Sequence, residues 1–148
     1  MILIPPKDIH IVEDKIRPWL IKACEDHMSH VFITVDDYIN TMKEGRRYLF
    51  ATVPIEFIVV CQLEIVKEKK RLVILFCAGK NYKKHVDDGI ETCIDFAKIS
   101  GCSEIISHIR IGIAKDFFRW GFSENKYKHK HKEVFKVIGD SQTSNAGR

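Results

Sequence analysis

Two apolar runs that follow one another closely constrain the fold more than any other feature of this sequence. Ile55–Val66 is nearly all apolar, Leu72–Ala78 is nearly continuous, and a charged turn over Lys67–Lys70 separates them. Strands with so few polar positions are buried on both faces, because a half-exposed strand alternates apolar and polar residues. A sheet that is covered on both faces needs helices on each side. The two runs therefore predict an α/β domain, with a central mixed β-sheet and helices on both faces.

The first part of the chain predicts two helices before the first long strand. Between His10 and Met28 apolar residues recur every three or four positions, which is typical of an amphipathic helix. Pro18 removes a backbone hydrogen bond in this segment, so the main helix either begins near Arg17 or is kinked at the proline. A second, shorter helix is expected over Val35–Glu44.

Local start and stop signals define the helices further along the chain. Thr34 and Asp37 have the spacing of a capping box, and Gly45 supplies the C-terminal stop of the second helix. The clearest helical pattern covers Tyr82–Ser100 and ends at Gly101; its predicted core face consists of Val86, Ile90, Cys93, Ile94 and Ala97. The other predicted elements are a strand over Arg47–Val53, a strand over Glu104–Ile109, a short helix over Ile113–Trp120 that Gly121 stops, and one or two strands over Phe122–Ile138.

Composition predicts one ordinary globular domain. The 148 residues are 45% hydrophobic and 30% charged, which suits a single domain over residues 1–138 followed by a disordered polar tail over 139–148. No apolar run is long enough to cross a bilayer, and the N-terminus lacks a signal-peptide pattern, so a cytoplasmic protein is expected. The net charge of +4 is too modest to indicate a nucleic-acid partner. The five cysteines have no paired spacing and are expected to be reduced core residues, with Cys102 the most exposed.

Four stretches of sequence carry a resemblance to a known family. They are IPP near the start, GRRYLF, EIV with the following KKRLVILFCAGK, and GCSEIISHIRIGIAKDFFRWGFSE. Together with the order of predicted elements they resemble the GNAT acetyltransferases, in a divergent form that tailed phages and prophages encode, although no convincing first strand is evident. The resemblance implies acyl-CoA-dependent transfer of an acyl group to an unknown amine. The alternative is a GNAT scaffold that has lost catalysis and acts as a virion or assembly component, or binds a host protein.

The resemblance also implies where acetyl-CoA would bind. Relatives hold its pyrophosphate on a glycine-rich turn, where this chain has CAGKNYKKHVDDG. Gly79 alone permits close approach, Lys83 and Lys84 with Lys80 would replace the missing backbone cradle, and strands splayed near Cys77 would admit the pantetheine arm. Asp87 and Asp88, expected in the first helical turn, would repel a phosphate, so weakened acetyl-CoA binding is expected. The alternative is that these lysines are simply solvated and the acids stabilise the helix dipole.

Candidate catalytic groups are few. Glu64 lies near the end of an apolar strand, where a half-buried carboxylate can act as a base; the alternative is an ordinary strand-end carboxylate paired with a lysine. Arg110 either contacts an anionic substrate or pairs with a carboxylate of the fold. The short helix offers Phe117 and Phe118 where relatives often have the tyrosine that protonates the leaving thiolate.

The segment KYKHKHK over Lys126–Lys132 allows three interpretations. Alternation places four lysines on one side of a strand and Tyr127, His129 and His131 on the other. Such a strand can be a phosphate-tracking ribbon, a two-histidine metal site or an edge hairpin guarded by lysines. The third interpretation is preferred, since no further metal ligand lies close in sequence, and neither a metal nor a nucleic-acid partner is expected.

Overall fold

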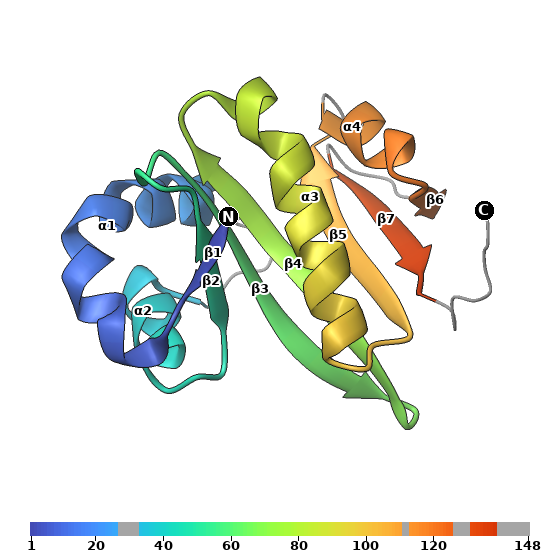
Figure 1. Ribbon diagram of the computed structural model, residues 1–148, viewed down its shortest axis with the longest axis horizontal. Helices are drawn as coiled ribbons and strands as arrows, with labels where there is room; N and C mark the ends of the chain where they lie inside the picture. Colours follow the sequence, from blue (N-terminus) through green and yellow to red (C-terminus); the bar gives the residue numbers. More distant parts are fainter. Residues whose placement is uncertain (27–32, 111–112, 126–130, 139–148) are drawn as a thin grey trace.

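A mixed seven-stranded sheet forms the centre of the protein (Figure 1). The computed structural model describes residues 1–26, 33–110, 113–125 and 131–138. The strands are ordered β1-β2-β3-β4-β5-β7-β6, and only the β4–β5 pair is parallel. The strand bounds are β1 Ile2–Ile4, β2 Tyr48–Ala51, β3 Phe57–Val66, β4 Lys69–Gly79, β5 Glu104–Arg110, β6 Ser123–Asn125 and β7 His131–Val137.

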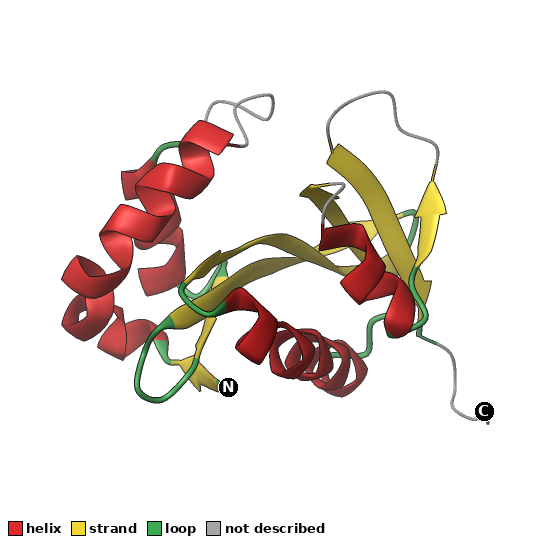
Figure 2. Cartoon of the chain, turned by 90° about the horizontal axis from the view of Figure 1, so that it is seen from above, coloured by secondary structure: helices red, strands yellow, loops and turns green. Residues whose placement is uncertain are grey.

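Helices cover both faces of the sheet (Figure 2). The helix α1 (Ile9–Asp26), which a short 3-10 turn over Pro6–Asp8 precedes, packs with α2 (Val35–Lys43) on one face. The long helix α3 (Tyr82–Ile99) and the short α4 (Ala114–Arg119) pack on the other. Each layer has its own apolar core, so the expected α/β architecture with two helical layers is confirmed. The predicted core face of α3 is confirmed as well, because all five of its residues are buried.

Two expectations about the N-terminal part are wrong. The strand β1 exists and pairs antiparallel with β2, although three residues before a Pro-Pro pair are too few to show alternation in sequence. The helix α1 continues through Pro18 as one element, so of the two alternatives the start near Arg17 is wrong. Pro18 lies on the exposed side of α1, as does Asp14, whose carbonyl loses its helical partner there and can bond with water.

The predicted helix ends are confirmed by their hydrogen bonds. The Thr34 hydroxyl accepts from the Asp37 backbone N–H at 3.1 Å, and the Asp37 carboxylate accepts from the Thr34 N–H at 3.0 Å. After α3, Gly101 adopts a φ of +76° and the N–H of Cys102 bonds back to the Ala97 carbonyl at 2.9 Å. This closure turns Cys102 into the core, where it is only 5% exposed, and the expectation that it is the most exposed cysteine is wrong.

Some expectations fall outside the described residues. They concern the tail over 139–148, and the KYKHKHK segment, of which only the backbone of His131 and Lys132 is described, in β7. Across the described ranges, no helix has the length and apolar character that a membrane crossing requires. The same ranges contain no cluster of three histidine, cysteine or carboxylate side chains that would suit a metal ion.

Candidate active site between two diverging strands

The parallel strands β4 and β5 separate part-way along their length. Their pairing runs from Arg71 with Glu104 to Ile74 with Ser107, yet β4 continues to Gly79 and β5 to Arg110. The divergence begins at an irregularity in β4: Ile74 pairs with Cys61 and Phe76 with Val60, which leaves the intervening Leu75 without a β3 partner. An extra residue of this kind bends a strand and re-aims the residues after it. The irregularity at Leu75 therefore lies where β4 separates from β5.

A cavity of about 370 Å³ occupies the region where the strands diverge. Its lining comes from both faces of the sheet. The residues toward α3 include Phe57, Ile74, Ile109 and Tyr82, whereas α1 contributes from the opposite face. The cavity thus lies in the plane of the sheet, with walls from the helical layers of both faces. Among the described residues the lining consists of Trp19, Lys22, Ala23, Phe57, Ile74, Phe76, Cys77, Ala78, Gly79, Tyr82, Ser107, His108, Ile109 and Ile113.

The N-terminus of α3 lies beside this cavity and carries no side-chain cap. Asn81 occupies the N-cap position in a left-handed conformation, with φ of +55°, and its side chain accepts no hydrogen bond from the helix. Uncapped N–H groups and the helix dipole together favour an anion. The first turn holds the exposed Lys83 and Lys84 and no acid.

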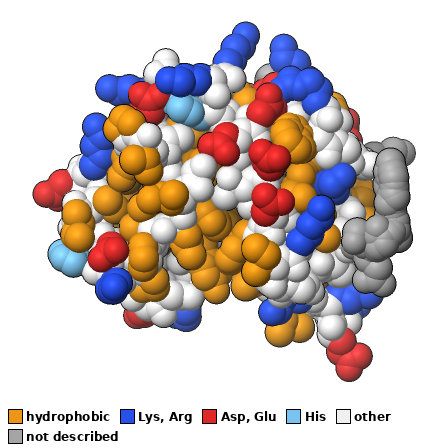
Figure 3. Space-filling view, viewed as in Figure 1, with side chains coloured by type: hydrophobic (Ala, Val, Ile, Leu, Met, Phe, Trp, Pro, Cys, Tyr) orange, Lys and Arg blue, Asp and Glu red, His pale blue; other side chains and the backbone are white. Residues whose placement is uncertain are grey.

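The two acids expected in the first turn of α3 lie one turn further along. The expectation that they would repel a phosphate at the N-terminus of α3 is therefore wrong. Asp87 accepts from the Trp120 indole N–H at 2.8 Å and from the Arg119 guanidinium at 2.9 Å, and these contacts lower its pKa. Asp88 binds the α-amino group of Met1 at 2.9 Å. Both carboxylates are thus paired. Acidic side chains form a strip over α3 in Figure 3.

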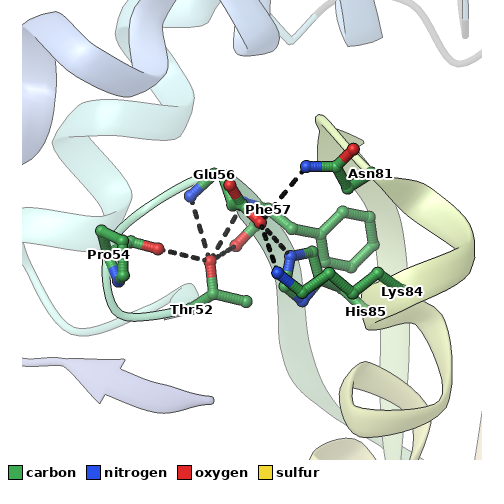
Figure 4. A network of polar contacts seen from close by, with 7 residues as sticks. All are labelled: Thr52, Pro54, Glu56, Phe57, Asn81, Lys84 and His85. Atoms are coloured by element: carbon green, nitrogen blue, oxygen red, sulfur yellow. Dashed lines mark hydrogen bonds and ion pairs between the residues drawn. The ribbon is translucent and has the colours of Figure 1, made fainter.

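The carboxylate that does approach the α3 N-terminus is Glu56, from the turn before β3 (Figure 4). It contacts the His85 ring, the Asn81 side-chain amide at 3.4 Å and Lys84 Nζ at 3.7 Å. The hydrogen bond from His85, followed by that from Asn81, holds the pKa of Glu56 below its usual value. The hydroxyl of Thr52 fixes the turn by accepting from the backbone N–H groups of Glu56 and the next residue at 3.0 and 3.2 Å. The Glu56 carboxylate therefore already places a negative charge at the N-terminus of α3.

Tyr82 lines the cavity from the α3 side. Its OH donates to Asp116 Oδ2 on α4 at 3.0 Å, and the Arg119 guanidinium donates to the same carboxylate at 3.1 Å. Burial raises the pKa of Tyr82, so the phenol stays protonated at neutral pH. The sequence suggested that the leaving thiolate would find no tyrosine, because α4 carries Phe117 and Phe118. The tyrosine of this cavity, Tyr82, lies on the facing helix α3.

His108 enters the cavity lining from β5. Its Nε2 lies 3.1 Å from Glu133 Oε1, and the two residues are direct partners in the antiparallel β5–β7 register. Ile105 and Ile109 of the same strand face the α3 side, so alternation places His108 on the opposite face, toward α1. A carboxylate beside one imidazole nitrogen fixes the orientation of the ring, an arrangement that is typical of histidines that act as general bases.

No protein-family model matches the chain, and no protein of curated function matches its sequence. Solved structures do match. Mosquito arylalkylamine N-acetyltransferase like 5b superposes with a TM-score of 0.67 at 11% identity, over 93% of this chain and 99% of that one. Arabidopsis thaliana Naa50, in complex with a bisubstrate analogue, gives 0.60 at 15% identity over 93% and 98%. A Bacillus subtilis acetyltransferase in complex with CoA gives 0.59 at 16% identity over 84% and 92%. This chain has the GNAT acetyltransferase fold.

The residues that sequence suggested for cofactor binding fall in two groups within this GNAT fold. Cys77 and Gly79 both line the cavity, and burial raises the pKa of the Cys77 thiol, so Cys77 is a protonated wall residue. Lys83 and Lys84 lie in the exposed first turn of α3. At Gly79, where φ is +123°, an added Cβ would collide with the Glu56 carbonyl and the Phe57 backbone. The glycine therefore permits the close approach of β3 itself.

Of the two suggested catalytic residues, the structure places Glu64 away from the cavity. Glu64 accepts from the Arg71 guanidinium at 3.1 Å and from the Gln62 amide at 2.9 Å, and it is not part of the cavity lining. It pairs with Arg71 toward the far end of β3, seven residues beyond Phe57, or roughly 23 Å along the strand. Arg110 ends β5 opposite His131 in register, and the position of its side chain lies outside the described residues.

Proposed function

We propose that this protein is an acyl-CoA-dependent N-acyltransferase, with acetyl-CoA as the donor and an amine as the acceptor. The observation that carries the proposal is the gap between β4 and β5, which lies in the plane of the sheet and has an uncapped helix N-terminus on one side and His108 on the other. A bimolecular transfer needs two substrates that meet from different directions. The two sides of the gap are the proposed approaches.

The residues present fit acetyl-CoA in two respects. The edge of β4 over Phe76–Gly79 has lost its β5 partner, so its outward backbone groups can pair with the extended amide chain of pantetheine, as an added strand would. The first turn of α3 offers uncapped N–H groups with Lys83 and Lys84 for the pyrophosphate. Glu56 opposes the second contact, which supports binding that is weaker than a fully cationic site would give.

The proposed chemistry assigns one proton transfer to each side of the cavity. Acetyl-CoA supplies an acyl group activated as a thioester. A neutral His108 whose Nε2–H donates to Glu133 carries its lone pair on Nδ1, which accepts a proton from the acceptor ammonium and leaves a nucleophilic amine. Collapse of the tetrahedral intermediate releases the second N–H proton of the attacking amine. The Tyr82 hydroxyl, turned from Asp116, passes its proton to the departing sulfur and regains that one, so the thiol leaves and the phenol is restored. These two roles replace those first suggested for Glu64 and Arg110.

The structural neighbours support acetyl-CoA as the proposed donor through what they bind. The Arabidopsis protein is complexed with an analogue that joins CoA to an acetylated peptide, and the Bacillus protein with CoA itself. Their identities to this chain are 15% and 16%, so the donor and the acceptor of this protein are proposals of our own.

Calorimetric titration with acetyl-CoA, followed by a thiol-release assay with a panel of amines, tests the proposal. We expect saturable binding and transfer that the His108→Gln variant loses while it still binds acetyl-CoA. The alternative, a phage virion or host-binding scaffold without catalysis, predicts no thiol release with any amine. Absence of acetyl-CoA binding by the folded protein would refute the proposed donor.

A further inference from the structure

The α1 wall of the cavity presents two hydrogen-bond donors and no acceptor. Trp19 and Lys22 both line the cavity, and their spacing of three residues puts them side by side on the helix surface. The indole N–H and the ammonium group can only donate. Neither side chain forms a hydrogen bond or an ion pair with another residue, within the part of the chain that the structure describes. Both donors are available to a bound molecule.

The charge of the cavity lining also favours a bound group that is negatively charged. Lys22 is its one permanently charged residue among the described residues, and aspartate and glutamate are absent from it. Glu133 lies behind His108, and Asp116 lies behind Tyr82, so each carboxylate is already engaged with a side chain that faces the cavity. A polycationic acceptor such as a polyamine would find no counter-charge here, and it would be repelled by Lys22.

The position of these donors relates them to the acceptor. Trp19 and Lys22 belong to α1, on the sheet face to which strand alternation also assigns His108. The α3 N-terminus, where the cofactor phosphates are proposed to bind, belongs to the opposite layer. A group bound by Trp19 and Lys22 is therefore carried by the molecule that presents its amine to His108.

We infer that the acceptor is an amine that also carries a carboxylate, bound by the Lys22 ammonium and the Trp19 indole N–H. This inference rests on the proposed function and specifies its acceptor class. Amino-acid-like acceptors fit the wall, whereas simple amines and polyamines leave both donors unpaired.

Binding of reaction products tests the inference without requiring catalysis. The probes are two matched pairs, N-acetylphenylalanine with N-phenethylacetamide and N-acetyltyrosine with N-acetyltyramine, and within each pair only the carboxylate differs. Titration in the presence of CoA should show the carboxylate member binding about tenfold more tightly, since hydrogen bonds to charged groups are strong. The preference should shrink when sodium chloride rises from about 0.05 M to about 0.5 M.

Two variants test whether Lys22 causes the carboxylate preference. Lys22→Met should reduce the carboxylate preference to within about twofold, while Lys15→Met, an exposed lysine of α1 outside the cavity lining, should leave it unchanged. Equal binding within both pairs, no binding of any probe, or a preference that survives Lys22→Met would overturn the inference. Weaker binding of acetyl-CoA itself to Lys22→Met would also overturn it, because Lys22 would then serve the donor.

The same measurements separate this inference from the proposed function. If the carboxylate preference is found but no amine is acylated, the binding of a carboxylate by Trp19 and Lys22 is supported and the proposed transfer activity is refuted. If amines are acylated and their decarboxylated forms react equally well, the activity stands and the inference fails.

Discussion

The Tyr82 hydroxyl lies 3.0 Å from Asp116 Oδ2 and joins α3 to α4 across the edge of the cavity. Asp116 is only 9% exposed, and the Arg119 guanidinium donates to it as well. A buried carboxylate with two donors is electrostatically satisfied, so it fixes the phenol without drawing its proton away. The hydroxyl is thus positioned by packing and hydrogen bonding together.

Replacing Tyr82 with phenylalanine should lower kcat for acyl transfer by about 100-fold, the usual effect of removing a general acid. The dissociation constant of acetyl-CoA should change little, because the ring remains. Steady-state kinetics and calorimetry measure the two quantities. Tyr48→Phe is the control, since Tyr48 packs against Phe96 outside the cavity, and it should retain full activity. An active Tyr82→Phe enzyme would remove the phenol from the mechanism.

His108→Gln should also lower kcat by about 100-fold and abolish the fall in rate that protonation of the base causes at acidic pH. Glu133→Gln should have a smaller effect, about tenfold, because it weakens the orientation of the ring and keeps the imidazole. The pH profile of kcat distinguishes these outcomes from a purely structural defect. If His108→Gln keeps the acidic limb of that profile, another group is the base.

Local sequence signals predicted the start of α2 and the end of α3 well because the groups involved are neighbours in the chain. Thr34 and Asp37 satisfy each other's backbone across one turn, and the closure at Gly101 uses residues within five positions. The strand β1 gave no such signal, since three residues define no period and its pairing with β2 spans more than forty residues.

The candidate site was predicted only in part, for the same physical reason. His108 meets Glu133 across 25 residues and Tyr82 meets Asp116 across 34, so neither pair is visible as a spacing. The one available signal was a histidine within the apolar strand IISHIRI. Glu64 had a comparable signal, but the strand register assigns it to Arg71 instead of the cavity.

The buried face of α3 provides a test of the fold. Ile90 is 2% exposed within the core between α3 and the sheet, so Ile90→Asp would bury an unpaired charge. We expect a loss of about 4 kcal/mol in the free energy of unfolding, measured by urea denaturation with circular dichroism. Ile99→Asp, at a position 85% exposed on the same helix, should cost at most about 1 kcal/mol. Equal losses would contradict the packing of α3.

Glu56 should make part of the stability depend on pH. Its pKa in the folded protein lies below the ordinary value because His85 and Asn81 bond to the carboxylate. Such a group stabilises the fold above its unfolded pKa of about 4.5, and this contribution is lost as the pH falls through the lower folded value. Glu56→Gln should therefore melt below the parent at about pH 7, and the difference should narrow at about pH 3. A difference that is independent of pH would refute this role.

The same Glu56→Gln variant should bind acetyl-CoA more tightly, although it is the less stable protein. The substitution removes a negative charge from the N-terminus of α3, and Lys84, which lies 3.7 Å from that carboxylate, becomes available to an incoming phosphate. We expect a gain of about threefold to tenfold in affinity by calorimetry, larger at low salt because the interaction is electrostatic. Glu44→Gln is the matched control: its carboxylate pairs with Arg46 after α2, and the affinity should not change. Unchanged or weaker binding by Glu56→Gln would mean that the phosphates of acetyl-CoA bind elsewhere, and the role proposed for the α3 N-terminus would fail with it.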